Sequence, residues 1–251
     1  SIGKYGIGTQ AVTDRIRELF PEINVIRWDR DAATNTAQYE DILKTFRSGC
    51  SQILVGTQLI AKGHHLPGVT LVGVVSADIG LGIPDFRAGE RAFQVLCQVA
   101  GRAGRGEYPG RVIIQTYQPD HYAIVAAAKQ DYPSFYEAES SYRRMYAYPP
   151  YSRLIRLVYQ HTNKVTAEHE AHNLSETILN QKSRWGISDT DVIGPTPTFP
   201  SRLRGSYRWQ IILRGPNPRS LLDKVYFAVN NAGKGKMPRG WFIDIDPVSF
   251  N

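Results

Sequence analysis

Cysteine is scarce in this chain of 251 residues, which contains only Cys50 and Cys97. Both lie in apolar stretches and far apart in the sequence, so we expect two buried thiols rather than a disulfide. Two scattered cysteines also exclude a zinc site made of several thiolates. This sparing use of cysteine favours a reducing compartment, and we expect a cytoplasmic protein.

Other signals are missing as well. No apolar run approaches the length needed to cross a bilayer, so we expect no membrane partner. The phosphate-binding pattern G-x-x-x-x-G-K-[ST] is absent, because Gly233-Lys-Gly-Lys236 has neither its spacing nor a preceding strand. An acidic cluster that would hold a magnesium ion is also absent. The chain alone is therefore not expected to bind and hydrolyse a nucleoside triphosphate.

Positive charge is concentrated in the second part of the chain. The net charge is +7, from 30 Lys and Arg against 23 Asp and Glu. Residues 1–150 contain 16 basic against 15 acidic residues, whereas residues 151–251 contain 14 against 8. Clustered cations with interleaved aromatic side chains attract nucleic acids. The predicted DNA-binding residues here are Arg202, Arg204, Tyr207, Arg208 and Trp209.

The most informative segment runs from Gln98 to Arg105 and reads QVAGRAGR. Its two arginines, Arg102 and Arg105, are three positions apart, which on a helix or a tight helical turn places them on the same side. The residues between them are small, so a bulky anion can approach closely. Two guanidinium groups side by side suit a phosphoryl group that gains charge in a transition state.

A second segment with polar residues lies upstream. An apolar run, predicted as a buried strand, ends at Gly56-Thr57-Gln58, and Lys62-Gly63-His64-His65 follows before a second apolar run from Val69 to Val75. Buried strands separated by polar loops are typical of a parallel sheet. Asp78 follows the second strand, where it can be structural or functional. A metal role for the two histidines is not expected, because adjacent ligands rarely converge and no third one is nearby.

Together the two segments resemble motifs V and VI of superfamily 2 helicases, and the version with two histidines resembles the PriA family of bacterial replication-restart helicases. The resemblance implies that Arg102 and Arg105 contact the γ-phosphate of ATP, with Gln98, Gly101, Lys62, Gly63 and His65 on the same nucleotide-binding surface. It implies DNA contacts for Thr57, Gln58 and His64. It also implies that ATP and Mg²⁺ are held mainly by a first lobe that is not in this chain, and zinc by an upstream insert that is absent too.

The resemblance extends to partners and to function. It implies an ATP-dependent 3′→5′ helicase that binds forks, D-loops and single strands, and that meets single-strand-binding protein and other primosome proteins in the bacterial cytoplasm, near the nucleoid. Because the chain begins with Ser1, we interpret it as a fragment, expected to be a monomer that binds DNA without hydrolysing ATP.

The order of predicted elements suggests an α/β protein. Residues 1–131 are predicted to form a RecA-like lobe, a parallel sheet flanked by helices, with a helix from about Arg87 into the Arg102 region. Residues 132–150 form a helical linker that ends in a Tyr-Pro-Pro-Tyr turn, within a helical stretch expected from 119 to 147. Residues 151–251 are predicted to fold as a smaller basic domain of β-α-β-β-α-β order, whose second strand is a short one at 192–194.

Two other functions are compatible with parts of the sequence. The segment Gly6-Ile-Gly-Thr-Gln-Ala11, with Asp29 further along, fits the fingerprint of a nicotinamide-dinucleotide-binding oxidoreductase. However, five residues are too few for the strand that must precede it. A module without catalytic activity that binds DNA or proteins is the third possibility.

Overall fold

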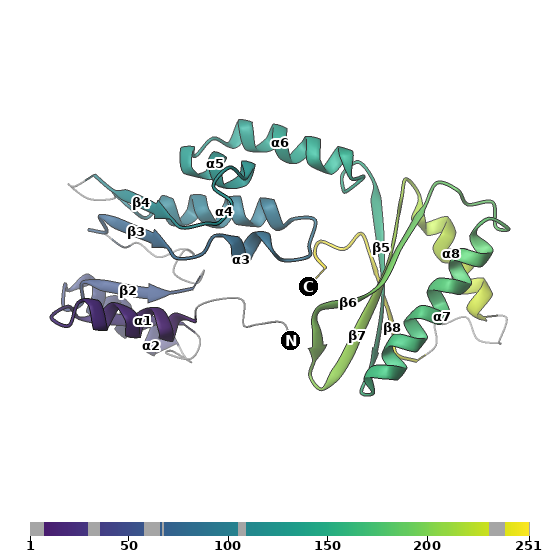
Figure 1. Cartoon of the computed structure of the whole chain (residues 1–251), viewed down its shortest axis with the longest axis horizontal. Coiled ribbons are helices and arrows are strands. Elements are labelled where there is room, and N and C mark those ends of the chain that lie inside the picture. The colour runs from purple at the N-terminus through teal and green to yellow at the C-terminus, as the bar shows by residue number, and fades with distance from the viewer. Residues whose placement is uncertain are drawn as a thin grey trace. The chain divides into compact units, whose positions relative to one another are not determined.

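The computed structural model describes residues 8–29, 36–57, 66, 68–104, 109–230 and 239–250 (Figure 1). They divide into two compact units. The first contains residues 1–82 and 89–135, and the second contains residues 83–88 and 136–251. None of the described helices is long and apolar enough to cross a membrane.

The first unit alternates helices and short parallel strands. Its elements are α1 (Thr9–Leu19), β1 (Val25–Trp28), α2 (Thr36–Arg47), β2 (Ile53–Gly56), β3 (Leu71–Val74), α3 (Asp78–Leu81), α4 (Ala88–Ala100), β4 (Arg111–Ile114), α5 (Tyr122–Lys129) and α6 (Tyr132–Met145), the last continuing into the second unit. β1 pairs with β2 and β3 pairs with β4, each in parallel. The predicted parallel pairing is therefore present, but in two two-stranded sheets rather than one continuous sheet.

Two apolar clusters hold the first unit together. One gathers around Trp28 and Leu43 and includes Leu66, with Val69 packed against it. The other joins α4 to α5 through Phe93 and Leu96, and the ring of Phe93 stacks on Phe135 of α6 at 4.1 Å between centroids. These clusters set the position of the residues that precede β3 and of the apolar face of α4.

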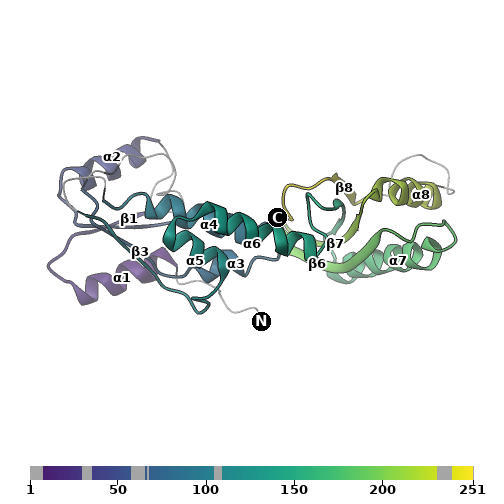
Figure 2. The same ribbon diagram turned by 90° about the horizontal axis from the view of Figure 1, so that it is seen from above.

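The second unit has the predicted β-α-β-β-α-β order. Its elements are β5 (Arg153–His161), α7 (Lys164–Lys182), β6 (Asp191–Leu203), β7 (Ser206–Gly215), α8 (Pro218–Asn230) and β8 (Trp241–Ile245). The strands form one antiparallel sheet in the order β6-β7-β5-β8. Both helices cover the same face of this sheet, as two views show (Figures 1 and 2).

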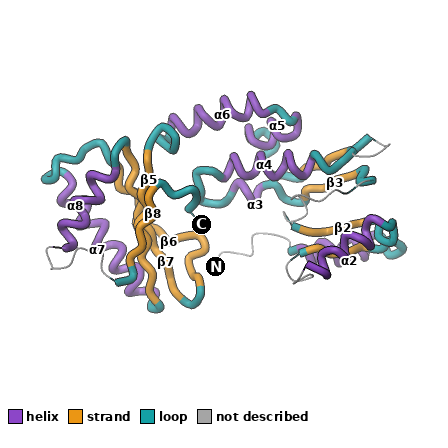
Figure 3. The backbone as a smooth tube through the Cα atoms, turned by 180° about the vertical axis from the view of Figure 1, so that it is seen from behind, coloured by secondary structure: helices purple, strands orange, loops and turns teal. Residues whose placement is uncertain are grey.

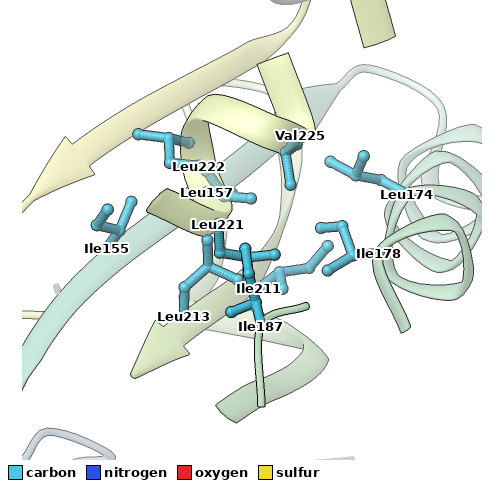
Figure 4. Packing of buried hydrophobic residues seen from close by; sticks show 10 residues of the cluster. All are labelled: Ile155, Leu157, Leu174, Ile178, Ile187, Ile211, Leu213, Leu221, Leu222 and Val225. Atoms are coloured by element: carbon cyan, nitrogen blue, oxygen red, sulfur yellow. The ribbon is translucent and has the colours of Figure 1, made fainter. Parts of the chain in front are cut away.

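The core of the second unit lies between that face and the two helices. Leu174 and Ile178 of α7 and Leu221 and Val225 of α8 point toward strand residues such as Ile211 (Figure 4). Along a strand, side chains alternate between the two faces. Residues 155, 157, 211 and 213 therefore face the helices, and residues 154, 156, 210 and 212 face the other side of the sheet.

That other side is covered by residues 83–88, which sequence analysis assigned to the first domain. Phe86 is buried there, with its ring 5.7 Å from Tyr148 and 5.4 Å from Phe250. The carboxylate of Asp85 accepts hydrogen bonds from Ser249 Oγ at 3.0 Å and from the backbone N–H of Phe250 at 3.1 Å. The segment that precedes α4 thus belongs to the core of the second unit (Figure 3).

Several local predictions differ from the structure. Cys50 is exposed and Cys97 is half-buried, so the expectation of two buried thiols is wrong for Cys50. The sequence also suggests Thr9 as the cap of the first helix, but the cap of α1 is Gly8, and Thr9 donates its hydroxyl hydrogen to Asp29. The stretch from 119 to 147 holds two helices, because Gln130 adopts a left-handed conformation at φ 53° that ends the first.

Candidate functional site

Arg102 lies in a tight turn directly after α4, which ends at Ala100 and not within the arginine pair. Three successive backbone hydrogen bonds continue the coil beyond that end: Gly101 N–H to Cys97 O at 2.9 Å, Arg102 N–H to Val99 O at 3.0 Å, and Ala103 N–H to Ala100 O at 3.2 Å. The last two span three residues, which is the tighter 3₁₀ pattern common at helix ends. Arg102 is half-buried as a residue, and its Nε atom is buried.

The turn closes at Gly104 through contacts that require glycine. Gly104 has φ 76°, a conformation that side chains disfavour, and its N–H donates to Val69 O at 3.0 Å. Gly110 lies against it so closely that a Cβ on Gly110 would stand 2.2 Å from Gly104 N. The turn that carries Arg102 is therefore fixed at both its helix end and its glycine end.

The hydrogen bond to Val69 connects the turn at Arg102 to the residues that precede β3. Val69 lies on the stretch from Thr57 to the start of β3, and it packs against the Trp28 cluster. The arginine turn is thus attached to the amino ends of β3 and β4. Thr57 is exposed and follows the carboxyl end of β2, and Gln98 is exposed on α4. The predicted site residues Gln58, Lys62, Gly63, His64, His65 and Arg105 lie outside the described residues.

Asp78 has a structural role at the carboxyl ends of β3 and β4. Its carboxylate accepts hydrogen bonds from Thr116 Oγ1 at 2.8 Å and from the backbone N–H of Tyr117. Burial would raise the pKa of Asp78, but these hydrogen bonds stabilise the carboxylate and lower the pKa overall. The side chain therefore joins the two strand ends to each other.

The predicted DNA-binding residues of the second unit lie on the hairpin formed by β6 and β7. Arg204 at φ 48° and Gly205 at φ 84° make its two-residue turn, since Leu203 pairs with Ser206. Arg202 is exposed, and its guanidinium lies 5.2 Å from the centre of the Tyr207 ring. The tip of the hairpin therefore presents Arg202 and Arg204 to solvent.

Arg208 and Trp209 are neighbours on β7 and face opposite sides of the sheet. The indole of Trp209 packs edge-on against His172 of α7, at 5.5 Å between ring centroids. Arg208 faces the side of Arg156, whose buried guanidinium donates from Nε to Gln210 Oε1 at 2.7 Å. Burial, and then the charge of Arg208, lower the pKa of Arg156. The five predicted residues thus do not share one face.

The described residues contain no group of three His, Cys, Asp or Glu side chains that could hold a metal ion. The described part of the arginine turn, residues 101–104, carries one cation and no carboxylate. Such a turn fits a phosphate group rather than a metal.

Comparisons with known proteins match both units. The profile of the family "Helicase conserved C-terminal domain" matches residues 9–107, and that of "Primosomal protein N C-terminal domain" matches residues 144–248. A replication restart protein PriA of Bacillus subtilis is 44% identical over 84% of this chain and 26% of its own length. Those of Treponema pallidum and Synechocystis are each 38% identical, over 97% and 98% of this chain and 36% and 29% of their own lengths.

The chain belongs to the PriA family. It spans between 26% and 36% of the length of the PriA relatives it matches. The helicase profile begins at residue 9 and includes the second half of the Gly6–Ala11 segment together with Asp29. Asp29, the acidic residue of that fingerprint, is buried and pairs with Arg27 Nε at 3.3 Å, besides its bond with Thr9. PriA membership explains both predicted helicase motifs, and the oxidoreductase interpretation explains neither.

Sequence reasoning missed the segment 83–88 as a link to the second unit. Two of its partners, Ser249 and Phe250, are more than 160 residues away from Asp85. The sequence signal was the apolar character of Phe86 between two polar residues, which by itself indicates burial but not against what.

Proposed function

We propose that this chain is the second helicase lobe and the C-terminal DNA-binding domain of an ATP-dependent 3′→5′ DNA helicase that acts on forked DNA in replication restart. Residues 1–131 form the lobe, residues 132–150 the linker and residues 151–251 the basic domain. The hydrogen bond from Gly104 to Val69 is the observation that carries this proposal. It fixes the QVAGRAGR segment to the residues just before β3, which follow the loop that begins at Thr57 in the sequence, and this supports a shared site for the two predicted motifs.

In this proposal, Arg102 and Arg105 contact the γ-phosphate of ATP bound to another lobe. The residues beside Arg102, namely Gly101, Ala103 and Gly104, have small side chains or none, which favours the close approach of a phosphate. Gln98, Gly101, Lys62, Gly63 and His65 belong to the same surface. A bound Mg²⁺ would neutralise phosphate charge, and its carboxylate ligands belong to the other lobe. This chain supplies fixed positive charge for the transition state.

DNA contacts are proposed on both units. Thr57, Gln58 and His64 contact the phosphates of the translocating strand, whereas the hairpin arginines contact the fork. The chain alone is expected to bind DNA without hydrolysing ATP. Single-strand-binding protein and other primosome proteins are the proposed protein partners. The relatives of Bacillus subtilis and Treponema pallidum are replication restart proteins, which supports this assignment.

The experiment for DNA binding uses two double variants of the 251-residue chain. Replacing Arg202 and Arg204 by alanine should weaken fork binding, because both side chains are exposed on the hairpin tip. Each lost phosphate contact reduces the magnitude of the negative slope of log K against log salt concentration by about 1. The slope of this variant should therefore be shallower by about 2. Fluorescence anisotropy at several salt concentrations measures both quantities.

The control removes the same charge elsewhere on the second unit. Lys164 and Arg184 are exposed at either end of α7, and their double alanine variant should keep the slope of the original chain. If the two double variants behave alike, the hairpin is an ordinary basic surface, and its proposed role in fork binding is wrong.

A further inference from the structure

Strand β6 contains a bulge on the basic hairpin. Pro197 pairs with Trp209 and Arg202 pairs with Tyr207, so residues 198–201 lie opposite the single residue Arg208. Bulges re-aim side chains that regular pairing would place along the strand. Thr198 is buried inside this one, and its hydroxyl donates to Pro200 O at 2.7 Å. The bulge is therefore internally braced.

The bulge presents Phe199 to solvent. Phe199 is 48% exposed, and Leu203 near the tip is 47% exposed. The other two aromatic side chains of the hairpin are less open: Tyr207 is covered by the guanidinium of Arg202, and Trp209 packs on His172. Phe199 is thus the hairpin's most accessible aromatic surface, although sequence analysis had selected Tyr207 and Trp209.

The positive charge of the stretch that contains Phe199 favours a negatively charged partner. No acidic residue occurs from Val192 to Leu222, a stretch that contains five arginines. Arg214 among them pairs with Asp191 at 2.8 Å, but Arg202 and Arg204 flank Leu203 on the exposed tip. The hairpin thus exposes two apolar side chains, Phe199 and Leu203, and the exposed charged residues near its tip are arginines. Apolar surface and positive charge on one element suit a nucleic acid, which offers both bases and phosphates.

We infer that Phe199, assisted by Leu203, contacts unpaired bases at the junction of single-stranded and duplex DNA while Arg202 and Arg204 hold the adjacent phosphates. This inference rests on the proposed function and adds a base-contacting element to it. Proteins that open or kink DNA use Phe and Leu side chains in this way, and stacking on an aromatic ring tolerates any base sequence. The braced bulge keeps the ring in place before DNA arrives, which reduces the entropy lost on binding.

The test compares Phe199→Ala with Phe242→Ala in the complete chain. Phe242 is a matched control, because it is 54% exposed at the other edge of the same sheet, on β8. Phe199→Ala should weaken binding to a forked DNA by about tenfold and leave the salt slope unchanged, since no phosphate contact is removed. Phe242→Ala should leave fork binding unchanged. Phe199→Trp should bind the fork at least as tightly as the original chain.

A fork with abasic sites at the junction separates base contact from a structural effect. On this DNA the penalty of Phe199→Ala should disappear, because the bases that the ring contacts are gone. A penalty of equal size on the abasic fork, or none on the normal fork, would overturn the inference. If Arg202 and Arg204 prove necessary while Phe199→Ala has no effect, only this inference fails. If the chain binds no DNA, the proposed function fails with it.

Discussion

Replacing either Arg102 or Arg105 by alanine should lower ATP turnover about a thousandfold, the lower end of the effect of an arginine finger. The measurement needs the nucleotide-binding lobe. It therefore uses a chimaera in which this chain replaces the matching segment of the Bacillus subtilis PriA relative, which is 44% identical. The loss is large because a guanidinium that meets the transferred phosphoryl group stabilises the transition state more than bound ATP. Steady-state phosphate release on forked DNA measures it.

The control for this pair is Arg111→Ala in the same chimaera. Arg111 is exposed at the start of β4, close in sequence to the arginine turn. This variant should keep its turnover, and all three variants should keep their affinity for the fork. If ATP turnover stays within a few-fold of the original in both Arg102→Ala and Arg105→Ala, neither arginine contributes to ATP hydrolysis as proposed.

Replacing Phe86 by alanine should destabilise the second unit by about 3–5 kcal/mol, as expected for a large buried aromatic side chain. The variant loses the packing of Phe86 against Tyr148 and Phe250 and its contact with the Arg143 guanidinium, which lies 5.5 Å from the ring centre. Hydrogen exchange read by mass spectrometry follows the two units separately. Amides of β5 and β7 should lose protection before those of α5.

Phe242→Ala is again a suitable control, because its exposed ring should cost no more than about 0.5 kcal/mol. If Phe86→Ala lowers the stability of the first unit and spares the sheet of the second, residues 83–88 belong where sequence analysis had placed them. That result would contradict the packing of residues 83–88 in the core of the second unit.

Local sequence patterns predicted most elements but failed where tertiary context decides. The apolar stripes at residues 12–20 and 39–46 predict two helices, and the structure has α1 and α2 there; the strand predicted at 207–213 is part of β7. Strand β6 is much longer than the predicted strand at 192–194. Pro195, Pro197 and Pro200 disfavour a strand, so the sequence pattern gives no sign that the strand continues beyond residue 194. Proline is tolerated there since β6 lies at the edge of the sheet, where one side of the strand needs no hydrogen-bonding partner.

The candidate site divides in the same way. The turn at Arg102 was predicted from small residues and from the spacing of the two arginines. Both features are local, so a short segment of sequence is enough to predict it. The end of this turn is held by the close packing of Gly104 on Gly110 and by the hydrogen bond from Gly104 to Val69. No local sequence pattern indicates either contact. On the hairpin, composition identified the basic residues, but which aromatic ring is open depends on the bulge at 198–201. A bulge changes the facing of side chains without leaving a periodic signal.

The role of the segment before α4 is a further feature that the sequence did not indicate. Asp85 and Phe86 bind residues near the end of the chain within the second unit. The buried face of α4 packs through Phe93 and Leu96 within the first unit.

The central claim is that this chain places its arginine segment against the γ-phosphate of a nucleotide bound elsewhere. The most direct measurement is photo-crosslinking of the chimaera with an ATP analogue that carries the reactive group on its γ-phosphate, followed by mass spectrometry of the labelled peptides. The account predicts label on a peptide within residues 98–105. Label confined to other parts of the chimaera, with none in that segment, would contradict it.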